Sequence, residues 1–288
     1  MRMSVREPIF ILAAPRSFTS LISTMLGQHP EAYGVPELNL FVADTIEQWL
    51  DYFYYLAKYR RIHGLLRTIC QLYAGEQTID SVAMAYRWIL TRFNSSTSDV
   101  YWELCHQVAP LRIVDKSPVY CASSENLYRI QNTFPSAHYI HLIRHPRPQG
   151  QSAKKIFHDL VDPQHLWYRA QHNILDFLST VPPDRQMRLR GEDLLNDPRS
   201  HFQKICQWLD FTWNESILET MLRPEESPYA CLGPYGANFG NDPNFLKSPA
   251  YRYRPVAYSQ LDGPLPWRQD NKGFLRPVIK LAQELGYQ

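Results

Sequence analysis

The sequence has few cysteines and places them far apart. The five thiols are Cys70, Cys105, Cys121, Cys206 and Cys231. Because their number is odd, their spacing is wide and no Cys-x-x-Cys pair occurs, both a disulfide framework and a zinc site are disfavoured. We therefore expect a protein of a reducing compartment, the cytoplasm, and we expect no bound metal.

Long apolar runs and a large net charge are lacking as well. The N-terminal apolar run covers only residues 9–14 and stops at Pro15, so it is too short for a signal peptide or a membrane span. Thirty Lys and Arg face 28 Asp and Glu, a net charge of +2. Such a balance creates no global field that would attract nucleic acid. We expect neither nucleic acid nor a membrane as partner, and any anion site must be local.

Two well-known nucleotide motifs are also missing. No Gly-x-x-x-x-Gly-Lys-Ser/Thr occurs, so hydrolysis of a nucleoside triphosphate has little support. The dinucleotide pattern Gly-x-Gly-x-x-Gly is absent too. The chain instead offers 288 residues with 44% hydrophobic content, enough for one large α/β domain with a sizeable core.

Residues 9–27 have the pattern of a buried strand, a polar turn and an amphipathic helix. At such a junction the first helical N–H groups lack intrahelical acceptors and can bind an anion. Further donors come from the side chains of Arg16, Ser17, Thr19 and Ser20. The alternative is an ordinary connection in which the hydroxyls merely cap the helix.

Strand and helix patterns alternate along the rest of the chain. Strands are predicted within residues 31–41, 111–118, 137–143 and 186–190. Helices are predicted within residues 44–74, 78–94, 163–179, 198–209 and 274–285, with another beginning near Gln149. This alternation predicts a single α/β domain over residues 1–288 with a central parallel sheet flanked by helices. Residues 41–110 form a helical insertion on the acceptor side, and residues 229–268 an irregular segment that we interpret as a lid.

Polar residues stand at the carboxyl ends of these strands, where open α/β sheets bind ligands. The strand at 111–118 delivers Asp115, Lys116 and Ser117, and the strand at 137–143 leads into Arg144. Glu37 follows the short strand after the opening unit. These positions are candidates for a site that holds an anion and moves a proton.

Four stretches together resemble the sulfotransferases that use 3′-phosphoadenosine 5′-phosphosulfate, in the bacterial natural-product and tyrosylprotein-like branch. Residues 14–21, Ala-Pro-Arg-Ser-Phe-Thr-Ser-Leu, are similar to the 5′-phosphosulfate loop. Residues 115–118, Asp-Lys-Ser-Pro, match a strand end of this branch. Residues 142–147 with Ser152 resemble the 3′-phosphate motif, and residues 192–198 the Glu-Asp-Leu-x-x-Asp-Pro stretch. The resemblance spans residues 9–198 in the family's order and implies a P-loop-like 5′-phosphosulfate loop.

The resemblance also implies roles for individual residues. It assigns the 5′ end of the donor to Arg16, Ser17, Phe18, Thr19 and Ser20, and the 3′-phosphate to Arg144 and Ser152. Glu37, 21 residues after Arg16, lies where tyrosylprotein-type enzymes have their catalytic Glu. We therefore expect Glu37 to deprotonate the acceptor if burial keeps its pKa high enough, and Arg16 and Lys116 to stabilise the transferring sulfonyl group.

Several histidines compete with Glu37 for the role of base, since many sulfotransferases use His. The strongest rival is His106, which precedes Lys116 by ten residues in a region that looks like a loop. The others are His141, His145 and His172.

The chain departs from the family pattern at three places. Phe18 replaces the usual Gly of the loop, which would be strained if that position needs a positive φ. Gly191 stands where the family often has an aromatic residue before Glu192, so one adenine contact is missing. The C-terminal Arg-Lys-Gly motif of cytosolic sulfotransferases is absent, and residues 240–245 and 267–268 look instead like the tail of bacterial natural-product enzymes.

The predicted reaction is sulfuryl transfer from 3′-phosphoadenosine 5′-phosphosulfate to a hydroxyl or a nitrogen of a small metabolite or a carrier-bound intermediate. A kinase-like phosphoryl transferase and a nucleotide-binding module without catalysis are the alternatives, and Phe18 lends weight to the second. The sequence leaves open the acceptor, the choice between monomer and homodimer, and the choice between Glu37 and a histidine as base.

Overall fold

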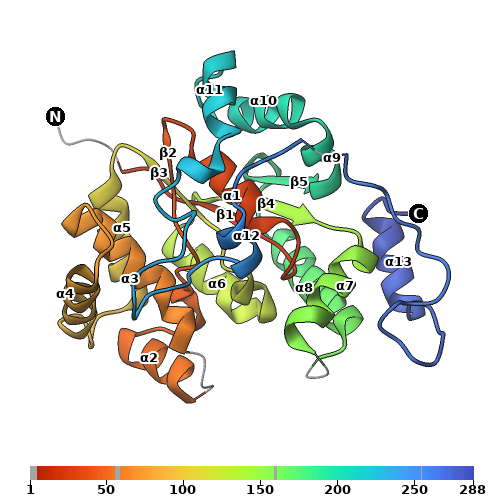
Figure 1. Cartoon of the computed structure of the whole chain (residues 1–288), viewed down its shortest axis with the longest axis horizontal. Helices are drawn as coiled ribbons and strands as arrows, with labels where there is room; N and C mark the ends of the chain where they lie inside the picture. The colour runs from red at the N-terminus through yellow and green to blue at the C-terminus, as the bar shows by residue number, and fades with distance from the viewer. Residues whose placement is uncertain (1–4, 56–58, 159–160, 254) are drawn as a thin grey trace.

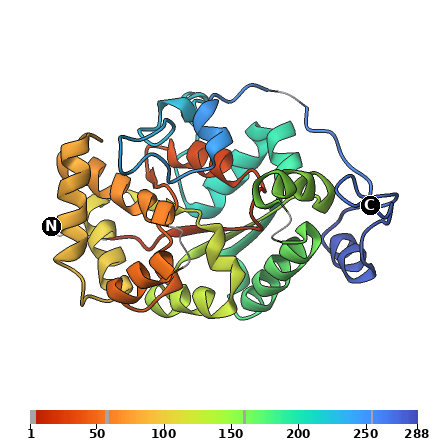
Figure 2. The same cartoon turned by 60° about the horizontal axis from the view of Figure 1, so that its bottom comes forward.

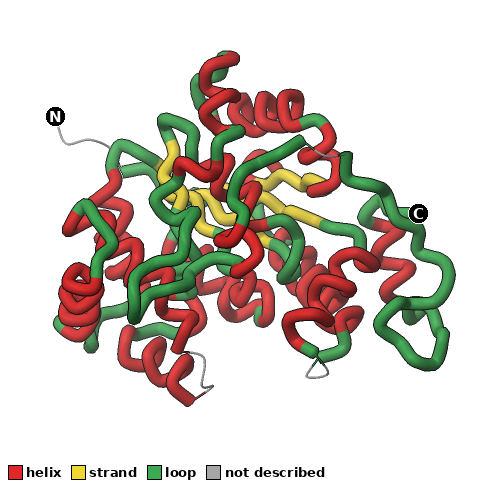
Figure 3. Tube along the Cα trace, viewed as in Figure 1, coloured by secondary structure: helices red, strands yellow, loops and turns green. Residues whose placement is uncertain are grey.

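The computed structural model describes residues 5–55, 59–158, 161–253 and 255–288. Within these residues a five-stranded sheet forms the centre of the molecule (Figure 3). Its strands are β1 (Ile9–Leu12), β2 (Ala32–Gly34), β3 (Arg112–Asp115), β4 (His138–Ile143) and β5 (Gln186–Arg190). The order is β2-β3-β1-β4-β5, and each neighbouring pair is parallel. The prediction of a single α/β domain with a central parallel sheet is confirmed.

The strand order reverses at β1. Ile9 pairs with Val114 of β3 on one side and with His138 of β4 on the other. The chain visits β2 and β3 on the first side before it crosses over to β4 and β5. In open parallel sheets a crevice forms outside the carboxyl ends of the strands at such a reversal. The end of β1, where the opening polar turn begins, is therefore the expected binding position.

Helices cover both faces of the sheet (Figure 1). Because successive side chains of a strand point to opposite faces, Phe10 and Leu12 join one buried cluster while Ile9 and Ile11 join the other. The larger cluster includes residues of α2–α6, α8 and α13, and the smaller one residues of α1 and α9–α11. The helices are α1 (Thr19–Gly27), α2 (Ile46–Tyr55), α3 (His63–Ile69), α4 (Ile79–Leu90), α5 (Thr97–Val108), α6 (Ser124–Thr133), α7 (Pro146–Phe157), α8 (Pro163–Leu178), α9 (Gly191–Asn196), α10 (Pro198–Leu209), α11 (Glu215–Met221), α12 (Pro243–Lys247) and α13 (Arg276–Glu284).

Two local predictions need correction. The helix expected to begin near Gln149 begins at Pro146, because proline suits the first helical turn and the His145 ring accepts a hydrogen bond from the N–H of Arg147. The region around His106 is not a loop but the last turn of α5, whose start is capped by the Ser96 hydroxyl. This helix lies within the predicted helical insertion at 41–110, although the apolar pattern does not delimit it; Ser96, a favoured N-cap residue, marks its start.

The C-terminal part is largely irregular, as expected. Residues 255–275 contain neither helix nor strand and lead to α13 at the periphery of the molecule (Figure 2). Tyr287, near the end of the chain, returns to the sheet and donates a hydrogen bond from its hydroxyl to Glu192 Oε2 (3.0 Å). None of the helices in the described part of the chain is both long enough and apolar enough to cross a membrane.

Candidate active site

The turn between β1 and α1 holds two residues in the left-handed region, Arg16 with φ 72° and Phe18 with φ 61°. Because a Cβ makes this conformation unfavourable, the strain considered for Phe18 is present. Ser17 between them is fully buried, and its hydroxyl has no partner among the described residues. Thr19 and Ser20 open α1, where first-turn N–H groups lack an acceptor within the helix. The turn thus presents several unused donors at one place.

Arg144 and Ser152 converge on this turn from the other side of β1. Arg144 follows β4 and donates from Nη1 to the carbonyl oxygen of Arg16 (2.6 Å). Ser152, on α7, accepts a hydrogen bond on Oγ from Arg16 Nε (3.0 Å). Burial lowers the pKa of Arg144 to about 10, which still leaves the guanidinium charged at neutral pH. Two motifs more than 120 residues apart in sequence therefore meet.

Glu37 lies at the bottom of the same region with two cations. Lys116 Nζ donates to its Oε1 (2.9 Å), and Arg61 Nη1 donates to its Oε2 (2.9 Å). Burial alone would raise the pKa of Glu37, but the charges of Lys116 and Arg61 outweigh it and hold the pKa below its ordinary value. The carboxylate is therefore ionised and able to accept a proton, while its basicity is lower than the sequence-based hypothesis assumed.

Lys116 is wholly buried beneath Glu37, with an exposed side-chain fraction of 0%. It does not line the neighbouring cavity, so in this conformation it acts on the cavity through the carboxylate of Glu37. The expected direct contact with a sulfonyl group stays a prediction that requires movement of Glu37.

The other residues of the Asp-Lys-Ser-Pro stretch fix the backbone near Glu37. Asp115 is buried and accepts hydrogen bonds from the hydroxyls of Ser117 (2.8 Å), Tyr120 (3.2 Å) and Tyr101 (3.3 Å). Burial raises the pKa of Asp115 to about 7. The Ser117 hydroxyl in turn accepts a hydrogen bond from the N–H of Asn39 (3.1 Å). The end of β3 thereby holds the segment that carries the base candidate.

A cavity of about 540 Å³ opens above Glu37 and the β1–α1 turn. Of the predicted site residues, it is lined by Arg16, Thr19, Ser20 and Glu37. The remaining predicted residues, Ser17, Phe18, Lys116, Arg144 and Ser152, lie outside its lining. One wall is apolar and is made by Val119, Ile156, Phe157, Val161, Leu166 and Ala170. Such a cavity suits a reaction between a bound anion and an acceptor with an apolar part.

Sequence analysis missed several cations and one acidic residue of this cavity. Arg60 and Arg61 reach it from the short helical turn Tyr59–Ile62, and Arg169 from α8. Asp242, just before α12, accepts a hydrogen bond on its carboxylate from Arg16 Nη1, and its N–H donates to Ser20 Oγ (3.2 Å). The quoted tail motif contained Asp242, but nothing in its local pattern linked it to a loop 226 residues away.

The rival histidines lie elsewhere. His106 is exposed on α5, whereas His141 is buried in β4 with its Nε2 2.6 Å from Gln171 Oε1. His145 caps α7, and none of these three lines the cavity above Glu37. This arrangement favours Glu37 among the proposed bases.

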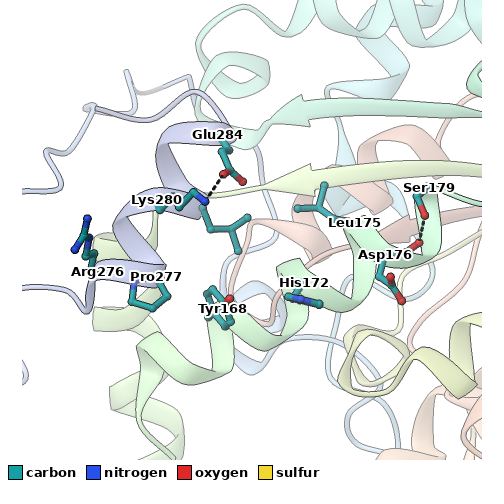
Figure 4. Close-up of a pocket in the computed structure, with 10 residues that line it drawn as sticks. Tyr168, His172, Leu175, Asp176, Ser179, Arg276, Pro277, Lys280 and Glu284 are labelled. Carbon is teal, nitrogen blue, oxygen red and sulfur yellow. Dashed lines mark hydrogen bonds and ion pairs between the residues drawn. The ribbon is translucent and has the colours of Figure 1, made fainter.

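His172 lines a different groove, of about 620 Å³, between α8 and α13 (Figure 4). Its charged rim includes Asp176, Lys280 and Glu284, and the last two form an ion pair (3.9 Å). Of the residues predicted for the donor site or as the base, His172 alone lies in this groove. We therefore place the candidate active site at the β1–α1 turn rather than in this groove.

The residues at the turn fit a phosphorylated nucleotide. Ser17 Oγ and Arg144 Nε are buried polar atoms without a partner among the described residues, and Arg16 adds a second guanidinium. Buried donors next to fixed cations are the groups that bind phosphate oxygens. Within the described residues, no group of three or more His, Cys, Asp or Glu side chains is arranged to hold a metal ion.

Comparison with known proteins shows the family of the chain. A model of the sulfotransferase family matches residues 8–215, more than half of the chain. The chain belongs to the sulfotransferase family. Comparison of this sulfotransferase with curated proteins gave no match.

Two solved structures resemble this sulfotransferase over nearly its whole length. The sulfotransferase domain from the curacin biosynthetic pathway is 26% identical, with 99% of each chain covered and a TM-score of 0.77. The sulfotransferase domain of the olefin synthase of Synechococcus PCC 7002 is 27% identical over 99% of this chain and 96% of that one, with a TM-score of 0.79. Membership of this family favours sulfuryl over phosphoryl transfer, so the kinase-like alternative loses its support.

Proposed function

We propose that this sulfotransferase uses 3′-phosphoadenosine 5′-phosphosulfate and sulfates a hydroxyl, or a nitrogen, of a small metabolite or a carrier-bound biosynthetic intermediate. The observation that carries the proposal is the convergence of Arg144 and Ser152 on the Arg16 turn. A nucleotide that bears phosphate at both its 3′ and 5′ ends needs two anion sites of this kind. The biosynthetic context in the names of the two similar domains supports an acceptor from such a pathway.

In the proposed reaction the acceptor oxygen forms a bond to sulfur while the bond from sulfur to the bridging phosphate oxygen breaks. Negative charge grows on the leaving phosphate, and the donors at the start of α1 together with Arg16 are placed to stabilise it. The acceptor's proton passes to the Glu37 carboxylate. Lys116 and Arg61 keep that carboxylate ionised before the transfer.

Arg16 must change partners during the cycle. In this conformation its guanidinium is paired with Asp242 and hydrogen-bonded to Ser152. An incoming phosphosulfate competes with the Asp242 carboxylate for the same cation. Residues 240–243 line the cavity, which is consistent with the lid interpretation of the segment that contains them.

The test combines donor binding with group transfer. Calorimetry should detect binding of adenosine 3′,5′-bisphosphate, the desulfated product, and at least tenfold weaker binding of ATP. Incubation with donor carrying labelled sulfate and a panel of hydroxylated and carrier-bound acceptors should yield labelled product. Preference for ATP would overturn the donor assignment, and bisphosphate binding without transfer to any acceptor would favour the non-catalytic alternative.

A further inference from the structure

Phe18 and Gly191, two of the departures from the family pattern, are far apart in the sequence but lie side by side in the structure. A Cβ built on Gly191 would lie 2.7 Å from Cδ2 of the Phe18 ring, too close for any side chain. Gly191 begins α9 directly after β5, and the ring of Phe18 packs into the space that its missing side chain leaves. The bulky residue in the loop and the small residue on the neighbouring element are thus sterically matched.

The Phe18 ring is also in contact with Arg144. The guanidinium carbon lies 4.0 Å from the ring centroid, a cation–π distance. The guanidinium is also fixed by the bond from Nη1 to the Arg16 carbonyl, and the Arg144 carbonyl accepts a hydrogen bond from Trp167 Nε1 (2.9 Å). Arg144 Nε is buried and has no partner among the described residues. The side chain is therefore held by the Phe18 ring and the Arg16 carbonyl, while its Nε donor is unused.

We propose that Phe18 is a positioning residue for Arg144, and that Gly191 is the notch that admits its ring. Through Arg144 the pair favours nucleotides that carry a phosphate at the 3′ position. This inference rests on the proposed function, because it assigns Arg144 to the 3′-phosphate of the donor. The left-handed backbone of Phe18, with φ 61°, is the conformation in which its ring contacts both Gly191 and Arg144.

A purely structural role for Phe18 leads to a different expectation. An aliphatic side chain of similar size would fill the notch against Gly191, but it has no π face for the guanidinium. Leucine and tyrosine at position 18 therefore separate the two roles. Leucine keeps the Cβ and most of the apolar volume, whereas tyrosine keeps the aromatic face.

The first experiment measures two affinities by calorimetry for the wild type, F18L and F18Y. One ligand is adenosine 3′,5′-bisphosphate, and the other is adenosine 5′-phosphate, which lacks the 3′ group. We expect F18L to bind the bisphosphate about five- to tenfold more weakly and the monophosphate as the wild type does. F18Y should keep the wild-type ratio of the two affinities. If F18L leaves the ratio of bisphosphate to monophosphate affinity unchanged, whether or not both affinities fall, the inference is overturned while the proposed function stands.

The second experiment tests the steric match. G191A should reduce the ratio of bisphosphate to monophosphate affinity, because its methyl group displaces the Phe18 ring. This effect should disappear in the F18G background, where no ring is present. Thermal unfolding of each variant reports whether it is folded at the temperature of the titrations. An equal effect of G191A in both backgrounds overturns the match. Failure of the folded wild type to bind the bisphosphate overturns the proposed function, and the inference with it.

Discussion

At the scale of single residues, the pair of Glu37 and Lys116 links stability to chemistry. Lys116 is fully buried, and Glu37 supplies its negative charge at 2.9 Å. A buried charge that loses its partner destabilises a protein far more than an exposed one does. A substitution at Glu37 therefore changes both the proposed base and the counter-charge of Lys116, and the experiment must separate these effects.

We predict that E37Q abolishes sulfate transfer while the affinity for adenosine 3′,5′-bisphosphate stays near that of the wild type. Because Lys116 keeps only a neutral partner, the free energy of unfolding should fall, by up to about 3–5 kcal/mol. Transfer assays, calorimetry and urea unfolding measure the three quantities.

The double variant E37Q/K116M is the matched control for this prediction. It removes the unpaired cation, so stability should return toward the wild-type value while transfer stays absent. Transfer at the wild-type rate in E37Q would show that Glu37 is not the base. Recovery of transfer together with stability in the double variant would mean that E37Q had lost activity through misfolding.

Arg144 carries a separate prediction. Its removal in R144A takes away a charge-assisted hydrogen bond, so binding of adenosine 3′,5′-bisphosphate should weaken by about 1.5–3 kcal/mol. Exposed Arg199, which pairs with Glu215 on α11, offers R199A as a control that should leave binding unchanged. Equal affinities of R144A and the wild type in calorimetry would contradict the assignment.

The donor-binding residues could be predicted from sequence because they lie close together within short motifs. Arg16, Ser17, Thr19 and Ser20 lie on one turn, and Arg144 follows a recognisable strand. Arg61 could not be found in this way, because its contact with Glu37 depends on how a helical turn packs 24 residues further along the chain. The low basicity of Glu37 was missed for the same reason, since Arg61 contributes to it.

At the scale of elements, residues 240–242, just before α12, contact Arg16 and Glu37. Glu37 N–H donates to the carbonyl of Gly240 (2.7 Å), and Asp242 is hydrogen-bonded to Ser20 and paired with Arg16. Further back, Arg67 is buried and donates hydrogen bonds to the carbonyls of Pro228 and Phe239. Arg67 thus holds the chain at Pro228 and Phe239, while residues 240–243 line the cavity.

We predict that D242N binds adenosine 3′,5′-bisphosphate more tightly, by about five- to tenfold. The reason is that the wild-type carboxylate competes with the ligand for Arg16, and a partly buried ion pair of this kind is worth about 1 kcal/mol. Asparagine can still accept the hydrogen bond from the N–H of Asn244 that caps α12. Weaker binding in calorimetry would mean that Asp242 assists the ligand rather than competes with it.

The alternation of strands and helices made the fold predictable at this scale. The helix at 198–209 has the predicted bounds, and the four strands after β1 fall within the predicted ranges. The start of α7 and the bounds of α5 were not predicted, because Pro146 and Ser96 act through capping and not through apolar periodicity.

At the scale of the whole molecule, buried histidines connect folding to pH. Burial is the main cause that lowers the pKa of His63, His138, His141 and His145 to about 4. In the unfolded chain these rings bind a proton near pH 6.5. Below about pH 6.5 the unfolded chain binds protons on these rings that the folded protein does not bind until about pH 4. The contribution of the neutral histidines to stability is therefore present above pH 6.5 and is lost as the pH falls toward 4.

His141 offers the clearest test of this dependence. Its neutral ring bonds Gln171 through Nε2 and accepts from Arg188 on Nδ1 (3.3 Å), so a second ring proton would face a guanidinium. Between pH 7 and pH 4.5 we expect the wild type to lose roughly 2 kcal/mol more unfolding free energy than H141Q does. Urea unfolding at both values measures it. Equal losses of unfolding free energy in the two proteins would contradict the role of His141. Asp115, whose raised pKa makes stability change with pH in the opposite direction, is present in both proteins, so its effect cancels in the comparison.

The strand order has a consequence for how new acceptors could be obtained. Arg16 and Arg144 lie at or just beyond the ends of neighbouring strands β1 and β4, whereas the outer walls that carry no predicted donor residue come from the Tyr59–Ile62 turn and α8. The two groups of walls are separate stretches of chain. Exchange of the outer walls between relatives should therefore alter which acceptor is chosen and leave nucleotide recognition intact, so this scaffold is suited to grafting of acceptor loops.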